Sequence, residues 1–205
     1  MRIAGLCLAA GAAQRMGQPK QLLPWGKTTL LQTCVHNLLR TQMCDCTVVV
    51  GANAQDVTAS LEEFAQEERF SITVNERWAE GMSTSLAAGV RSLLKREAAD
   101  NPYIGVLIAL GDMPFVEPRF ITLLLEEQQR WGSTAIVAPV YAGKRGHPVL
   151  IGRAYWQELL QLSGDRGAAE VLRRHQGQLH LVPGTAGVLM DIDTVEQWRE
   201  RRPSF

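Results

Sequence analysis

The chain has 205 residues, enough for one domain with a sizeable hydrophobic core. Lysine and arginine together number 21, as do aspartate and glutamate, so no net field favours binding to nucleic acid or to an anionic membrane. The four cysteines (Cys7, Cys34, Cys44 and Cys46) show the spacing of neither a zinc ribbon nor a Cys-x-x-Cys motif, which predicts reduced thiols.

The first predicted element is a strand over residues 3–8. It belongs to an apolar stretch, residues 3–13, that is hydrophobic enough to resemble a secretory signal. However, cleavage near Ala13 would separate the strand from the motif that follows it. No run approaches the roughly 18 apolar residues of a membrane span, so we expect a soluble, cytoplasmic protein with no membrane partner.

Residues 8–20, LAAGAAQRMGQPK, form the most informative motif. Small side chains at its start let peptide N–H groups approach an anion, and two cations five residues apart can neutralise the charge of that anion. The spacing matches neither a P-loop nor the dinucleotide fingerprint, and an ordinary strand-to-helix turn is the alternative to a polyphosphate site. The predicted nucleotide-binding residues of this motif are Leu8, Ala9, Ala10, Gly11, Arg15 and Lys20.

Apolar runs predict further strands over residues 47–50, 72–74, 104–110 and 135–140. The stretches between them have helical spacing, with apolar faces made by Leu31, Val35, Leu38 and Leu39, by Val57, Leu61 and Phe64, by Leu86, Val90, Leu93 and Leu94, and, after Glu117-Pro118, by Phe120, Leu123 and Leu124. This alternation predicts a Rossmann-like, three-layer α/β/α fold with a mostly parallel sheet. Such sheets bind ligands at the carboxyl ends of their strands.

The second half is predicted to continue with strands over residues 148–152 and 179–182 and short helices over 153–162 and 168–175. No linker, repeat or low-complexity tract separates the two halves. We therefore expect a single domain, residues 1–205, with a nucleotide-binding part over 1–115 and an acceptor-binding part over 116–205.

Gly111-Asp112-Met113-Pro114 follows the predicted strand 104–110, which is apolar enough to be buried on both faces. A carboxylate here would lie near the phosphates of the first motif, where two anions repel each other unless a hard cation lies between them. Mg²⁺ binds one or two carboxylates together with phosphate oxygens. We therefore predict that Asp112 binds Mg²⁺, with a simple turn before Pro114 as the alternative.

A second acidic pair lies in residues 188–194, which we predict to be a strand followed by a helix containing Trp198. Asp193 and Thr194 have the residue types of a helix N-cap. We assign Asp193 to the cap and Asp191 to a second metal position. The opposite assignment, in which Asp193 binds the metal, stays open.

Polar residues also follow two other predicted strands. After residues 72–74 come Asn75, Gly81 and Ser83. Ser83 is expected to cap the next helix, whose N-terminus could also face an anionic ligand group. Asn53 follows residues 47–50 in the same way, and a simple turn would explain it equally well.

The motif Leu-Ala-Ala-Gly-x-x-x-Arg-Met-Gly-x-x-Lys resembles the signature of the MobA-like NTP transferase family, which has the fold of nucleotide-diphospho-sugar transferases. The resemblance spans nearly the whole chain, and Gly-Asp-Met-Pro and the Asp191–Thr194 segment occur in the family's order. It implies that Arg15, Lys20 and Asp112 are catalytic. It also implies that Asn75, Gly81 and Ser83 lie near the ribose and base of the nucleotide, and Asn53 joins the nucleotide-binding candidates because of its similar position after a strand.

The resemblance further implies the two substrates. Ala10 stands where cytidylyltransferases have Ala-Ala-Gly and guanylyltransferases have Ala-Gly-Gly, and the extra methyl group favours CTP over a purine nucleotide. The Gly-His-Pro-Val segment is similar to that of pyranopterin cytidylyltransferases. The acceptor-binding residues so implied are Met113, Pro114, Gly146, His147, Pro148 and Asp165.

The implied reaction is Mg²⁺-dependent transfer from CTP to molybdopterin, with a molybdoenzyme or its chaperone as a protein partner. One departure concerns the acceptor: Ala169 replaces the family's usual arginine, so Arg166 or Arg173 must substitute for it or the acceptor differs. Three alternatives stay open. They are a guanylyltransferase for the same pterin, an enzyme for another phosphorylated acceptor such as methylerythritol phosphate, and a non-catalytic nucleotide-binding chaperone.

Overall fold

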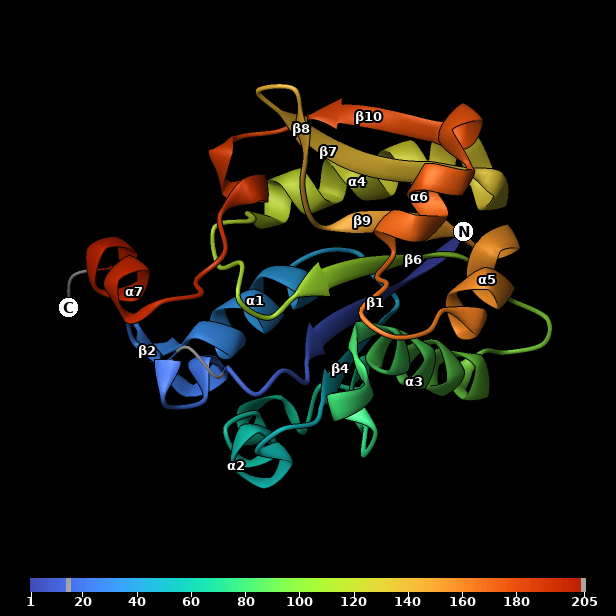
Figure 1. Ribbon diagram of the computed structural model, residues 1–205. Coiled ribbons are helices and arrows are strands. Elements are labelled where there is room, and N and C mark those ends of the chain that lie inside the picture. The colour runs from blue at the N-terminus through green and yellow to red at the C-terminus, as the bar shows by residue number, and fades with distance from the viewer. Residues whose placement is uncertain (14–15, 204–205) are drawn as a thin grey trace.

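A mixed eight-stranded sheet lies between two layers of helices in the computed structural model, which describes residues 1–13 and 16–203 (Figure 1). The strands follow the order β10-β7-β9-β6-β1-β4-β5, and the short β8 pairs with β7. β9 is antiparallel to both of its neighbours, whereas the other pairs in this order are parallel. The predicted α/β/α architecture with a mostly parallel sheet is confirmed. The strands are β1 (Arg2–Ala9), β4 (Asp45–Val50), β5 (Phe70–Val74), β6 (Tyr103–Leu110), β7 (Ile136–Tyr141), β8 (Lys144–Arg145), β9 (Val149–Gly152) and β10 (Leu179–Pro183).

The helices bury their apolar faces in two clusters on opposite sides of the sheet. One cluster contains α1 (Leu30–Leu39), α2 (Ala54–Ala59) and α4 (Pro118–Trp131). The other contains α3 (Met82–Arg96), α5 (Trp156–Gln161) and α6 (Ala169–Arg174). Because side chains alternate along a strand, Leu6 and Cys7 of β1 enter different clusters, and a strand apolar on both faces becomes fully buried.

A third, smaller cluster joins the two ends of the chain. It contains the hairpin of β2 (Pro24–Trp25) and β3 (Thr28–Thr29), together with the terminal helix α7 (Val195–Arg201). Ile192 is fully buried there, and Trp198 Nε1 donates to the carbonyl oxygen of Pro24 at 2.9 Å. The C-terminal segment is therefore attached to the connection that follows β1.

Local sequence signals explain where several helices begin. Thr29 and Gln32 form a capping box at the start of α1, and Pro118 occupies the first turn of α4. Short 3-10 helices lie in the connections, at Lys20–Leu22, Glu62–Phe64, Trp78–Glu80, Gly132–Thr134, Arg153–Tyr155, Gln176–Gln178 and Ala186–Leu189. Among the described residues, none of the helices is long and apolar enough to cross a membrane.

The structure corrects three of the predicted elements. Residues 188–194 are not a strand, because their hydrogen bonds go to loops: Val188 O accepts from His147 N, and Ile192 N donates to Asp112 O. Leu123 is 48% exposed, so it does not share the buried face of α4. The helix predicted around residues 57–64 ends at Ala59 and is followed by a 3-10 turn.

Candidate functional site

The strand register brings three loops together at the carboxyl edge of the sheet. Leu8 pairs with Leu110 and Ala9 pairs with Val50, so β1, β6 and β4 end at the same level. Gly111 N donates to Leu8 O at 2.9 Å, and Ala52 N donates to Ala10 O at 3.0 Å. The loop after β1 is thereby fixed on both sides.

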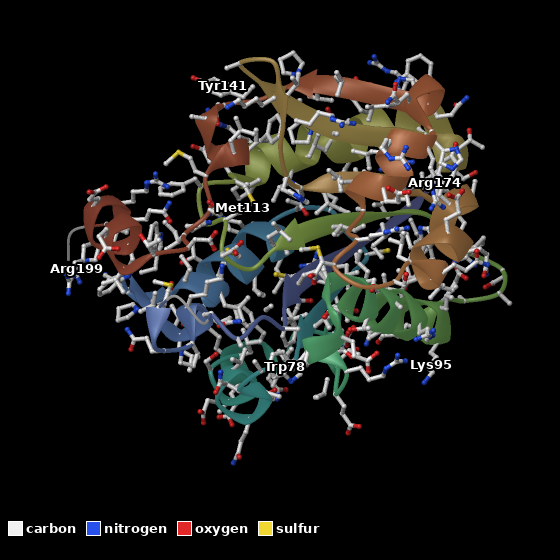
Figure 2. All side chains as sticks on the ribbon, viewed as in Figure 1. Trp78, Lys95, Met113, Tyr141, Arg174 and Arg199 are labelled. Carbon is white, nitrogen blue, oxygen red and sulfur yellow. The ribbon has the colours of Figure 1, made fainter. Side chains whose placement is uncertain are left out.

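A cavity of about 380 Å³ opens at this edge. It borders most of the predicted phosphate loop and the metal-binding candidate, and Figure 2 shows Trp78, one of its walls, beside α2 and α3. The predicted residues that line the cavity are Leu8, Ala9, Ala10, Gly11, Lys20, Gly81, Asp112 and Asp165. The lining residues that sequence reasoning missed are Ala12, Gln21, Trp78, Ala79, Met82, Ser85, Leu110 and Gly111.

Lys20 links the first motif to both acidic motifs. Its Nζ donates to Asp112 Oδ2 at 2.5 Å and to Asp193 Oδ1 at 2.6 Å. These contacts join residues 92 and 173 positions apart in the chain. Arg15, the other predicted phosphate-binding cation, lies outside the described residues.

The charges around Lys20 are unbalanced. Burial alone would lower the pKa of Lys20, but Asp112 and Asp193 outweigh this effect and raise it, so the side chain is a cation. Burial raises the pKa of the nearby Asp191, and repulsion from Asp193 and Asp112 adds to the rise. Among the described residues, one ammonium group thus lies near three carboxylates, and this excess negative charge favours a further cation.

The donor set fits a divalent ion that is shared with a phosphate ligand. Asp112 Oδ1 is buried with no hydrogen-bond partner among the described residues, while Oδ2 is taken by Lys20. Within the described part of the chain, no cluster of three or more histidine, cysteine, aspartate or glutamate side chains forms a metal site. Mg²⁺ usually needs few protein ligands when phosphate oxygens supply the others.

Asp193 is not the N-cap of α7, contrary to the sequence assignment. Thr194 caps the helix, because its side chain accepts from Gln197 N while Gln197 Oε1 accepts from Thr194 N. The Asp193 carboxylate is therefore free to contact Lys20. Of the two aspartates in this segment, Asp193 is the one that accepts from Lys20 Nζ, the same atom that donates to Asp112.

In the Asn75 segment, Gly81 lines the cavity as predicted, whereas Asn75 and Ser83 do not. Asn75 is buried, and its Nδ2 donates to Thr84 Oγ1 and Ser85 Oγ, so it holds the first turn of α3 while Ser85 lines the cavity. The predicted N-cap Ser83 lies inside α3, which Gly81 begins, and borders a separate polar pocket with Asn75. Asn53 starts α2 with left-handed backbone and does not line the main cavity.

The acceptor candidates are divided between two places. Asp165 lines the main cavity, on a loop that docks against α3. A Cβ atom on Gly81 would lie 2.4 Å from the carbonyl carbon of Gly164, so this approach requires glycine. Met113, which Figure 2 labels on the loop after β6, borders a small internal cavity with His147 and Pro148.

Backbone contacts near His147 explain why residue 146 is a glycine and what holds Pro114 in place. A Cβ atom on Gly146 would lie 2.1 Å from Val188 O, and His147 N donates to the same oxygen at 2.9 Å. Pro114 O accepts from Asn37 Nδ2, which fixes the loop after β6 against α1. Burial lowers the pKa of His147, so its imidazole is neutral at neutral pH and supplies no positive charge to an anionic acceptor.

The sequence is similar to a family model and to several proteins of known name. Residues 5–179 match the family model described as the MobA-like NTP transferase domain. The chain is 32% identical over 202 residues to nicotine blue oxidoreductase of Paenarthrobacter nicotinovorans, covering 95% of this chain and 94% of that protein. It is 26% identical to molybdenum cofactor cytidylyltransferase of Escherichia coli K12, covering 93% and 90%.

A solved structure shows the same fold with a divalent metal. The Rv0371C–manganese complex from Mycobacterium tuberculosis H37Rv superposes with a TM-score of 0.74 at 27% identity, covering 98% of this chain and 97% of that one. The expected nucleotide-diphospho-sugar transferase type of fold is confirmed.

Proposed function

The chain belongs to the MobA-like NTP transferase family and is a nucleotidyltransferase, and we propose that it transfers a cytidylyl group from CTP to the terminal phosphate of a molybdopterin-type acceptor. Pyrophosphate is the second product. The observation that carries the proposal is the meeting of Lys20, Asp112 and Asp193 beside the small-residue loop at one cavity.

In the proposed reaction, an oxygen of the acceptor phosphate attacks the α-phosphorus of CTP, and the bond to the β-phosphate oxygen breaks in line with the attack. The attacking phosphate is already ionised, so no side-chain nucleophile is needed. Lys20, Arg15 and the amides of the Leu8–Gly11 loop bind the triphosphate and the leaving pyrophosphate.

The carboxylates of Asp112 and Asp193 would hold the divalent ion, Mg²⁺ by preference, with Asp191 adding negative charge nearby. The unpartnered Oδ1 of Asp112 is the atom that supports this assignment. When bound, such an ion neutralises charge on the phosphate oxygens and on the leaving group. Lys20, which gives two of its three ammonium hydrogens to Asp112 and Asp193, would direct the third to the triphosphate.

Different residues of the cavity support the choice of base and the place of the acceptor. Ala10 and Trp78 both border the cavity, and these apolar walls limit the space for a base, which favours a pyrimidine. We place the acceptor on the side of Asp165. Ala169 at the start of α6 gives no positive charge there, and Arg173 is engaged with Glu170 at 2.8 Å, so Arg166 is the remaining candidate for an anionic acceptor.

The test is pyrophosphate release from each of the four nucleoside triphosphates, with and without a molybdopterin acceptor, in Mg²⁺ and in Mn²⁺. We expect release with CTP, acceptor and metal together. Preference for GTP would make the protein a guanylyltransferase, and CTP turnover only with another phosphorylated acceptor would change the second substrate. Redox conversion of nicotine blue without pyrophosphate release would instead favour the activity named for the Paenarthrobacter relative.

A further inference from the structure

Gln21 is the neighbour of Lys20 in the same 3-10 turn, and both residues line the cavity. It is 3% exposed. Its Nε2 donates to Ala9 O at 2.9 Å and to Gly11 O at 2.8 Å, so one amide group spans the small-residue loop. Its Oε1 is buried without a partner among the described residues, which is a cost that a simple packing role does not require.

These two bonds complete a pattern along the loop. Four consecutive carbonyl oxygens are held by the protein: Leu8 O by Gly111 N, Ala10 O by Ala52 N, and Ala9 O and Gly11 O by Gln21. Between the described residues, no hydrogen bond uses the N–H of Gly11 or Ala12, and both residues line the cavity. Carbonyl oxygens are thus kept away from a polyanion and N–H groups are left for it.

Building on the proposed function, we infer that Gln21 is a positioning residue that orients the backbone of the triphosphate loop. It acts through the peptide groups of Ala9 and Gly11 and does not touch the reacting atoms. A loop fixed in advance binds phosphate more tightly because less ordering remains to be done on binding. The effect should therefore fall on the phosphates and be independent of the base.

The chain offers a matched control for the loss of such an amide. Gln128 in α4 is fully buried, its Nε2 donates to Gly132 O at 2.7 Å and to Ala135 O at 3.4 Å, and its Oε1 is also unpartnered among the described residues. It does not line the cavity. Gln21→Met and Gln128→Met each remove the donors at nearly constant volume.

The experiment measures binding of CTP and of inorganic tripolyphosphate, each with Mn²⁺, by calorimetry, together with thermal unfolding of each variant. We expect Gln21→Met to raise both dissociation constants by about tenfold, and by the same factor, since tripolyphosphate has no base. Gln128→Met should lose comparable stability and keep wild-type binding. The KM for CTP should rise in Gln21→Met more than kcat falls.

A second variant covers a failure of Gln21→Met to fold. Gln21→Glu keeps the shape, but its ionised carboxylate donates no hydrogen bond, so binding should weaken and then partly recover, relative to wild type, as the pH falls and the carboxyl group gains a donor. Wild-type binding in the Gln21 variants, or an equal loss in Gln128→Met, would overturn the inference alone. Failure of the wild type to bind either probe would overturn the proposed function with it.

Discussion

At the residue scale, the site depends on a charged lysine that is already paired with two carboxylates before any substrate binds. Lys20 occupies one oxygen of Asp112 and one of Asp193, within 2.6 Å of each. These two contacts hold the ammonium group in one position, whereas an unpaired lysine side chain would adopt many conformations. A triphosphate with its metal can bind there without bringing a bare anion against Asp112.

Replacement of Lys20 by alanine should lower kcat/KM for nucleotidyl transfer by about a hundredfold to a thousandfold, because the leaving pyrophosphate loses its fixed cation. Asp112→Asn should have an effect of similar size through the metal. Circular dichroism should show an intact fold in both variants. Lys95→Ala is the control, since that exposed lysine of α3 does not line the cavity. Rates near wild type in either site variant would remove that residue from the mechanism.

The raised pKa of Asp191 predicts that its carboxylate lowers the stability of the fold at neutral pH. A carboxyl group with a raised pKa holds its proton better in the folded state, so stability is lost as the pH rises above the ordinary aspartate value and through the raised one. Asp191→Asn should therefore raise the free energy of unfolding at neutral pH, and the gain should vanish in acid. Denaturant unfolding at several pH values measures this. A gain that persists in acid would contradict the electrostatic cause.

Sequence reasoning identified Lys20 and Asp112 from their types and spacing, but it assigned Asp193 to a helix cap. Aspartate and threonine are both good N-caps, so composition alone could not choose between two adjacent candidates. The choice depends on where α7 begins, and that is set by packing of Ile192 and Trp198 on the N-terminal hairpin. Likewise, no local signal separates Ser83 from Ser85.

At the element scale, α7 and the segment before it keep Asp193 in the site. The capping box of Thr194 and Gln197 fixes the first turn of α7 next to that carboxylate. The matched case is the capping box of Thr29 and Gln32 on α1, neither of which lines the cavity. The two caps are chemically alike, so their removal separates stability from positioning.

Thr194→Ala and Thr29→Ala should each reduce the free energy of unfolding by about 1 kcal/mol, the usual loss for an N-cap. We expect weaker Mn²⁺ binding in Thr194→Ala alone, because Asp193 loses its fixed backbone. Thermal unfolding and calorimetric titration with Mn²⁺ and CTP measure the two effects. Equal Mn²⁺ affinities in the two variants would contradict a positioning role for α7.

A strong apolar period predicted most of the strands and helices, but an alternating pattern alone was not sufficient to predict a strand. β1, β4, β6 and α3 follow long apolar patterns that match the sheet or helix repeat, and their positions agree with expectation. Residues 188–194 alternate apolar and acidic side chains as a strand would, yet their backbone hydrogen bonds go to the loops that contain His147 and Asp112. Pairing is a tertiary property, and the local pattern does not contain it.

At the scale of the whole molecule, stability and chemistry are placed at opposite ends of the sheet. Near the amino ends of the strands, the buried Asp45 accepts from Arg2 at 2.9 Å, from Arg96 at 2.8 Å and from Tyr103 at 2.7 Å. Burial alone would raise the pKa of Asp45, but hydrogen bonds from Tyr103 and Arg96 outweigh it and lower the pKa. The cavity that we propose for the nucleotide lies at the carboxyl ends.

Asp45→Asn should reduce the free energy of unfolding by about 2 kcal/mol and leave the KM for CTP unchanged. Because a lowered pKa stabilises the fold above the ordinary aspartate value and the benefit is lost as the pH falls through the folded value, wild type and variant should converge in acid. Urea unfolding at neutral and acid pH, with CTP kinetics at neutral pH, checks both parts. Asp100→Asn, at an exposed aspartate, is the control.

The attachment of Ile192 and Trp198 to the N-terminal hairpin has a consequence for biosynthesis. Translation proceeds from the amino end, so the ribosome makes the phosphate loop and Lys20 long before Asp193. A nascent chain that stops short of residue 193 can fold much of the sheet but cannot yet surround Lys20 with both carboxylates. The pairing of Lys20 with both carboxylates can therefore form only after residue 193 has been made, late in synthesis.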